Sequence, residues 1–249
     1  MSDRTTHPQD DSEQPAGAPL SLVVVSGGTG NPSSSRLLAD RIAQKTADLI
    51  RRQGGIPTIQ VIELAPIALD IAQAIVSGLP GEQLKAAIRK LAAADGLIAV
   101  APVYTAGVSG LFKSFLDVID NDLIVAKPTL AAATAGSSRH ALVVDGQLRP
   151  VLAFLRALTV PTSVFAAPED WADSALGERI ARAATELATL MTTGVSTAIT
   201  DHAWSGYQHR FGGNATRAQQ TTADVDFDSP LMRLAAGGAP PRQEDPSGT

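Results

Sequence analysis

The segment of residues 22–36 constrains the fold of this sequence more than any other stretch. It starts with four apolar residues, Leu22 to Val25, a pattern typical of a buried strand in a parallel sheet. Pro32 cannot continue a strand but can occupy the first turn of a helix, and residues 33–35, here called the serine triplet, follow it. At the start of a helix the backbone N–H groups are unpaired and the helix dipole is positive. The segment therefore predicts a strand, a loop and a helix that can bind a phosphate group.

The glycine spacing in this loop argues against two familiar nucleotide-binding motifs. A Walker A loop ends in Gly-Lys-Ser/Thr, and no lysine follows a glycine in residues 27–30. The dinucleotide-binding pattern requires a glycine three positions after Gly30, where this sequence has Ser33. What remains is a loop that holds a terminal phosphate with serine hydroxyls, as flavin mononucleotide (FMN) sites in flavodoxin-like folds do. The alternative is an ordinary helix N-cap, a position at which serine is common.

Apolar runs and helical periodicity alternate through the rest of the chain. After the first strand we expect strands at residues 56–64, 96–101, 127–134 and 161–166. Helices are expected at residues 33–52, 67–77, 81–94, 110–120, 139–158 and 173–193, with Ser109 as the N-cap of the fourth. This alternation predicts an α/β fold, a flavodoxin-like doubly wound sheet of five parallel strands in the order 2-1-3-4-5 with helices on both faces.

Composition and charge limit the classes of function. The net charge of −5 gives no support for nucleic-acid binding, and the absence of cysteine excludes disulfides, thiolate zinc sites and cysteine nucleophiles. The N-terminal residues show no apolar run of the signal-peptide kind, and no stretch of about 18 residues is apolar enough to span a membrane. We therefore expect a cytoplasmic protein with neither a membrane nor a nucleic-acid partner.

We expect one folded domain between two tails. Residues 1–19 are rich in Asp, Gln, Ser and Pro and are expected to form a disordered extension. Residues 20–194 contain the predicted strands and helices. From Gly194 onward the composition becomes polar and irregular, so residues 195–249 are expected to form a tail that packs on a partner subunit or stays mobile.

Three loops are expected at the carboxyl edge of the sheet, where open α/β sheets bind their ligands. They are the loop with the serine triplet, residues 102–108 and residues 134–138. Small residues such as Gly136 would let the backbone approach a flat flavin ring closely. Tyr104 either borders that ring or is a surface aromatic residue on a turn.

Three short motifs in and after these loops are distinctive in combination. They are Asn31-Pro32 before the serine triplet, Pro102-Val103-Tyr104-Thr105, and Ser109-Gly110-Leu111-Phe112-Lys113. Together they resemble the NADPH-dependent FMN reductase family. Residues 133–142, 147–150 and 168–171 are similar to the subgroup that works with luciferase-like flavin monooxygenases. The resemblance covers residues 20–194.

The resemblance implies an NAD(P)H-dependent FMN reductase, with FMN and NADPH or NADH as cofactors. Hydride would pass from the nicotinamide to the flavin, which requires neither a catalytic acid or base of the protein nor a metal. The protein would supply reduced FMN to a flavin-dependent monooxygenase and would form a homodimer or homotetramer. The implied phosphate ligands are Ser26, Thr29, Ser33, Ser34 and Ser35. The implied neighbours of the ring and ribityl chain are Pro102, Val103, Tyr104, Thr105, Gly136 and Ser137.

Two points stay open at this stage. Many relatives carry an arginine inside the first loop, whereas this sequence has Arg36 only after the serine triplet, so Arg36 either turns toward the phosphate or faces solvent. The function is the second open point, because two alternatives remain. One is an NAD(P)H quinone or azo-dye reductase, which would use the same loops; the other is a non-catalytic flavodoxin-type electron carrier, which would keep its flavin. Such carriers are typically shorter and more acidic than this chain, which has 249 residues and a net charge of −5.

Overall fold

The computed structural model describes residues 19–204. Contacts divide the chain into two units, Met1–Thr216 and Arg217–Thr249, and the described residues all belong to the first unit. The expected extension at residues 1–19, apart from Pro19, and the tail beyond residue 204 lie outside the described residues. What the sequence indicates about them stays a prediction.

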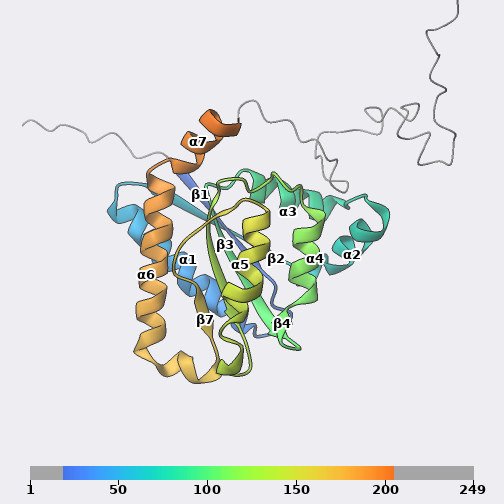
Figure 1. The fold of residues 1–249 in the computed structure, drawn as a ribbon, viewed down its shortest axis with the longest axis horizontal. Coiled ribbons are helices and arrows are strands. Elements are labelled where there is room, and N and C mark those ends of the chain that lie inside the picture. Colours follow the sequence, from blue (N-terminus) through green and yellow to red (C-terminus); the bar gives the residue numbers. More distant parts are fainter. Residues whose placement is uncertain (1–18, 205–249) are drawn as a thin grey trace, which may run out of the picture. The chain divides into compact units, whose positions relative to one another are not determined.

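A parallel sheet forms the centre of the described fold (Figure 1). The strands are β1 (Pro19–Ser26), β2 (Ile56–Glu63), β3 (Gly96–Tyr104), β4 (Gly107–Val108), β5 (Pro128–Thr134), β6 (Leu158–Thr159) and β7 (Val164–Ala166). They are ordered β2-β1-β3-β5-β6, with β7 also paired to β5 and β4 antiparallel to β3. With β4 left aside, this order corresponds to the expected order 2-1-3-4-5, and the predicted fold class is confirmed.

The hairpin formed by β3 and β4 differs from the loop that the sequence indicates at residues 102–108. β3 continues to Tyr104, and the chain turns back at once into β4. The two turn residues, Thr105 and Ala106, are not the Asn-Gly type of pair that predicts a two-residue hairpin. Local sequence therefore carries no signal for this hairpin.

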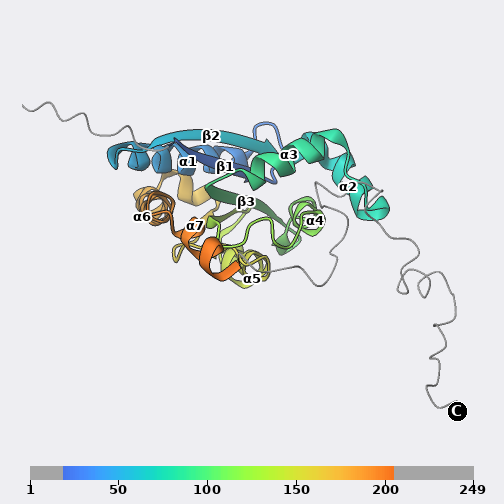
Figure 2. The same cartoon turned by 90° about the horizontal axis from the view of Figure 1, so that it is seen from above.

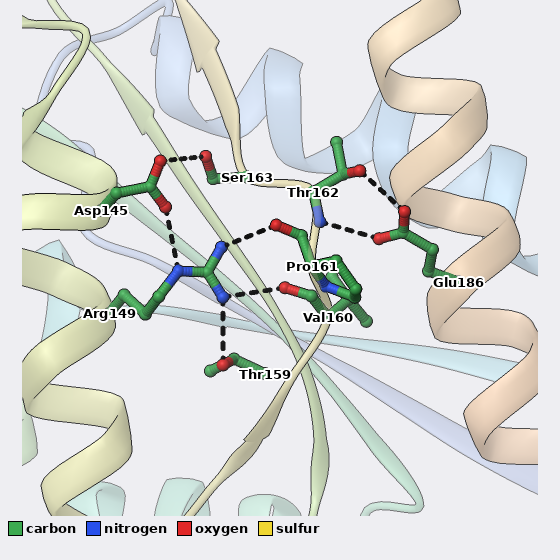
Figure 3. A network of polar contacts seen from close by, with 8 residues as sticks. All are labelled: Asp145, Arg149, Thr159, Val160, Pro161, Thr162, Ser163 and Glu186. Carbon is green, nitrogen blue, oxygen red and sulfur yellow. Dashed lines mark hydrogen bonds and ion pairs between the residues drawn. The ribbon is translucent and has the colours of Figure 1, made fainter.

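The fifth strand also differs from the prediction, because it is broken into β6 and β7 where a single strand at residues 161–166 is expected. Two side chains bind the backbone between the pieces (Figure 3). Arg149 donates to the carbonyl oxygen of Val160 at 2.8 Å, and Glu186 accepts from the amide of Thr162 at 2.8 Å. These backbone groups are bonded to side chains rather than to a neighbouring strand.

Helices cover both faces of the sheet. They are α1 (Ser34–Arg52), α2 (Ala68–Ser77), α3 (Glu82–Ala92), α4 (Gly110–Val118), α5 (Arg149–Phe154), α6 (Ser174–Thr192) and α7 (Val195–Ile199). The region 139–158, predicted as one helix, consists instead of a 3₁₀ turn (Ser138–His140), a π-helical segment (Val144–Leu148) and α5. α7 is helical where an irregular tail is expected, and Figure 1 shows it at the end of the sheet opposite the β3–β4 hairpin. No helix among residues 19–204 is long and apolar enough to cross a membrane.

Successive strand residues point to opposite faces of the sheet and build two separate cores. Val23 and Val25 of β1 pack in the core that includes residues of α2, α3, α4 and α5. Leu22 and Val24 pack in the core that includes α1 and α6. In Figure 2, β3 accordingly lies between α1 and α5. Because both of their faces are covered, β3 and β5 are almost wholly buried, whereas the edge strand β2 is partly exposed.

Serine hydroxyls cap two of the helices that begin at the carboxyl edge of the sheet. The Ser33 hydroxyl accepts a hydrogen bond from the amide of Arg36 at 3.2 Å at the start of α1. The Ser109 hydroxyl accepts from the amide of Phe112 at 3.3 Å at the start of α4, which confirms the predicted cap. Each cap satisfies one amide that the helix itself cannot pair.

Lys127 lies just before β5 and is almost fully buried. Its Nζ donates to the carbonyl oxygen of Ala92 at 3.1 Å and to that of Ala94, at the C-terminal end of α3. Burial lowers the pKa of Lys127 to about 8, although the nearby Asp95 carboxylate favours the charged form. A neutral amine still has two N–H groups, one for each carbonyl.

We expect the free energy of unfolding to rise between pH 8 and about 10.4, the pKa of an unperturbed lysine. In this range folded Lys127 has lost its proton while the unfolded chain still binds it, so raising the pH favours the folded state. The full gain is roughly 3 kcal/mol. Urea unfolding at several pH values measures it, and Lys127→Met should show a rise smaller by this amount. An unchanged rise in the variant would contradict the assignment.

Candidate functional site

A cavity of about 260 Å³ lies at the carboxyl edge of the sheet. Its walls come from the loop after β1 and the start of α1, from the C-terminal ends of β3 and β5, and from the segments that follow β5 and β7. They are Gly28, Thr29, Gly30, Pro32, Ser33, Ser34, Ser35, Pro102, Val103, Tyr104, Thr134, Ala135, Gly136 and Pro168. The three loops that the sequence places at one edge therefore meet around one cavity, and a fourth loop joins them.

Most of the predicted site residues line this cavity. They are Thr29, Ser33, Ser34, Ser35, Pro102, Val103, Tyr104 and Gly136. Ser26, Thr105 and Ser137 are not lining residues. Ser26 is buried at the end of β1 and Thr105 lies at the turn of the hairpin. The Ser137 hydroxyl is buried and has no hydrogen-bond partner within residues 19–204.

Other lining residues are not in the predicted set of site residues. They are Gly28, Gly30, Pro32, Thr134, Ala135 and Pro168. All but Pro168 lie in segments that the sequence already indicates as site loops. Pro168 follows β7, and the rule that ligands bind at the carboxyl ends of parallel strands applies to that strand as well. Two signals for Pro168 were available in the sequence: its place after a predicted strand, and the segment 168–171 that carries part of the family resemblance.

The three hydroxyls of the serine triplet have different surroundings. The Ser33 hydroxyl is the N-cap of α1, as described above. The Ser35 hydroxyl is buried and lies 2.7 Å from the hydroxyl of Thr134 at the end of β5. The Ser34 hydroxyl is exposed and has no partner within residues 19–204. The backbone amides of Ser34 and Ser35 belong to the first turn of α1 and have no acceptor within the helix.

Gly28 lets the first loop pass close to the serine triplet. A Cβ atom at this position would lie 2.0 Å from the Ser33 hydroxyl oxygen and 3.2 Å from the Cβ atoms of Ser33 and Ser35. No side chain fits there unless the Ser33 hydroxyl moves. The loop therefore depends on a glycine because of close packing rather than because of an unusual backbone angle.

Tyr104 connects the first two loops. Its hydroxyl lies 3.0 Å from the hydroxyl of Thr29, which belongs to the loop after β1. The side chain is half exposed, and the residue lines the cavity. Tyr104 is therefore part of the cavity wall, not an isolated surface aromatic.

Positive charge at the site comes from the backbone rather than from side chains. Arg36 pairs with Asp40 at 2.9 Å and with Glu63 at 3.1 Å, so the open question about this side chain is answered in favour of local ion pairs. The hydrogen bond to Asp40 is the main cause that raises the pKa of Arg36. None of the described residues that line the cavity is a lysine or an arginine. An anion here would be held by first-turn amides, hydroxyls and the helix dipole.

These features are those of a flavodoxin-like oxidoreductase, and comparison with known proteins gives the family. A family model described as NADPH-dependent FMN reductase matches residues 20–172. The chain belongs to this family and is an enzyme of the oxidoreductase class, as the sequence motifs predict.

Individual relatives agree with this assignment. The NADH-dependent FMN reductase SfnE of Pseudomonas putida is 39% identical over 67% of this chain and 89% of its own length. An FMN reductase (NADPH) of Pseudomonas aeruginosa is 34% identical over 62% of this chain and 80% of its own length. Among solved structures, an oxidoreductase from Corynebacterium diphtheriae is 41% identical with a TM-score of 0.68, over 70% of this chain and 97% of that chain.

The residues present fit FMN in two respects. The first turn of α1 offers amides that lack intrahelical acceptors next to the free hydroxyl of Ser34, a donor set suited to a terminal phosphate. In the third loop, Gly136 lines the cavity, and a Cβ atom at this position would meet nothing within 4 Å. The space beside its backbone is therefore open to a flat flavin ring.

We expect Gly28→Ala to destabilise the protein by about 1 kcal/mol, because the added methyl group displaces the Ser33 hydroxyl from its capping position. Urea unfolding measures this loss. Gly110→Ala is the control: Gly110 directly follows the capping Ser109 at the start of α4, and a Cβ there meets nothing within 4 Å. Equal stability changes in the two variants would show that the close approach at Gly28 has no energetic role.

Proposed function

We propose that this protein transfers hydride from NADH or NADPH to FMN and releases the reduced flavin to a flavin-dependent monooxygenase. The observation that carries the proposal is the cavity in which the serine triplet, the β3–β4 hairpin and the loop after β5 meet. Family membership supports the reductase activity. The release to a monooxygenase rests on the motifs that resemble those of the monooxygenase-associated subgroup.

On this proposal the phosphate lies at the start of α1. The amides of Ser34 and Ser35 and the hydroxyl of Ser34 donate to it, and Thr29 borders it from the loop after β1. The hydroxyls of Ser33 and Ser35 act indirectly, since the first caps the helix and the second bonds Thr134. Ser26 supports the loop from the end of β1.

The ring and the ribityl chain lie against the other two loops on this proposal. Pro102, Val103 and Tyr104 form one wall, and Gly136 leaves space on the opposite side. Ser137 supports the third loop and Thr105 shapes the hairpin, since neither residue lines the cavity. FMN, when bound, supplies the hydride-accepting chemistry at its N5 atom, and the protein contributes position and exclusion of water.

The donor preference, the assembly and the location are further parts of the proposal. One relative is named an NADH-dependent and another an NADPH-dependent enzyme, so we include both donors. A homodimer or homotetramer is expected from the family resemblance, and sedimentation of the full chain tests it. The cytoplasmic location stays a prediction of the sequence.

Ser34→Ala should weaken FMN binding by roughly tenfold and leave riboflavin binding unchanged, because riboflavin lacks the phosphate that this hydroxyl would bind. Quenching of flavin fluorescence measures both dissociation constants. Ser174→Ala is the matched control, since Ser174 is the exposed first residue of α6 and does not line the cavity. Equal weakening of FMN and riboflavin would mean that the phosphate does not lie at the serine triplet.

The purified protein should oxidise NADH or NADPH continuously when free FMN is supplied, and anaerobic ultrafiltration should then recover reduced FMN in the filtrate. A flavodoxin-type carrier would show almost no turnover without a separate reductase. A quinone or azo-dye reductase would turn over faster with a quinone acceptor while its flavin stayed with the protein. Reduced flavin that is retained by the protein would contradict delivery to a monooxygenase.

A further inference from the structure

The β3–β4 hairpin has a backbone conformation that its own residues do not favour. Thr105 and Ala106 have φ values of 49° and 62°, in the left-handed region where residues with a Cβ are strained. β4 contains two residues, and an isolated hairpin of this length is not stable in water. Contacts from elsewhere in the fold are needed to hold it.

Gln147 supplies such contacts from the π-helical segment. Its Nε2 donates to the carbonyl oxygen of Ala106 at 3.2 Å, and its Oε1 accepts from the amide of Val108 at 3.1 Å. Only this orientation of the side-chain amide gives both backbone groups a partner. The packing is close, because a Cβ atom at Gly107 would lie 3.2 Å from the same Oε1. One side chain thus binds the hairpin on both sides of Gly107.

The backbone that carries Gln147 is itself fixed. Asp145 and Arg149 flank it in the sequence and form an ion pair of 2.9 Å with each other. Asp145 also accepts from the hydroxyl of Ser163 at 2.9 Å, and Arg149 donates to the hydroxyl of Thr159 at 3.1 Å (Figure 3). Through these contacts, the backbone around Gln147 is attached to the segment between β6 and β7.

The hairpin in turn places Tyr104 against the cavity. Tyr104 is the last residue of β3, it directly precedes the strained turn, and its hydroxyl reaches Thr29. Gln147 does not itself line the cavity. We propose that Gln147 is a positioning residue that holds the β3–β4 hairpin, and with it Tyr104, in the conformation that binds the flavin ring. This inference rests on the proposed function, because it takes the ligand of the cavity to be a flavin.

The test compares Gln147→Leu, which loses both hydrogen bonds, with Gln147→Glu, which keeps an acceptor for Val108 but has no donor for Ala106. FMN and riboflavin dissociation constants are measured by fluorescence quenching. We expect Gln147→Leu to weaken both flavins by roughly fivefold, because the hairpin borders the ring and not the phosphate. Gln147→Glu should lie between Gln147→Leu and the wild type. Gln44→Leu, which removes an exposed glutamine bonded to Asp48 on α1, should bind both flavins as the wild type does.

A second measurement does not depend on flavin or activity. Amide hydrogen exchange in the peptide that contains Val108 should accelerate in Gln147→Leu and stay slow in Gln147→Glu, since only the latter keeps the acceptor. Faster exchange with weakened flavin binding supports the proposal. A lower thermal midpoint with unchanged flavin affinity, or unchanged exchange, overturns it. If the wild type itself fails to bind flavin, the proposed function fails, and this inference falls with it.

Discussion

The parallel pairing of β3 with β1 on one side and β5 on the other is the constraint on which the site depends. Val100 lies opposite Ser26, the last residue of β1, and Pro102 lies opposite Thr134, the last residue of β5, so both neighbours end beside the C-terminal part of β3. The chain leaves each strand at the same edge, and the segments that follow can share one cavity. The bond between the hydroxyls of Ser35 and Thr134 then connects the first loop to the third.

The site offers polar groups without charged side chains. Arg36, the nearest arginine in sequence, is bound to Asp40 and Glu63, and the first turn of α1 is left as the source of positive potential. Backbone amides are fixed in direction by the helix, so they favour a phosphate placed at one point. A flexible lysine would accept many positions instead. The arrangement therefore selects its ligand by geometry more than by charge.

Much of the fold follows from local sequence, and its exceptions have particular causes. The apolar runs of β1, β3 and β5 predict central strands, and the partly polar β2 is an edge strand as its pattern indicates. The break between β6 and β7 has one local signal, Pro161, which lacks a backbone N–H. The side chains that bind the backbone at the break, Arg149 and Glu186, come from two helices and could not be assigned from local sequence. The helix expected at 139–158 is interrupted by the π-helical segment Val144–Leu148. Asp145 within this segment and Arg149 directly after it are fixed by contacts with Ser163 and Thr159, on the two sides of the break.

The two sides of the candidate site, which we propose hold the phosphate and the flavin ring, also differ in how far they follow from local sequence. The phosphate side is local: a strand, a glycine loop, Ser33 as cap and the first turn of α1 occupy one continuous segment, so its motif can be read from the sequence. The ring side is not local, because the hairpin at Thr105 and Ala106 has unfavourable turn residues and is held by Gln147, about forty positions away. Loop residues named by resemblance could be placed at the cavity, but the contacts that fix their conformation could be found only in the folded chain. On the proposed function, substitutions at Gln147 alter the ring side and leave the phosphate motif intact, so the phosphate motif alone is an incomplete guide to flavin binding by this chain.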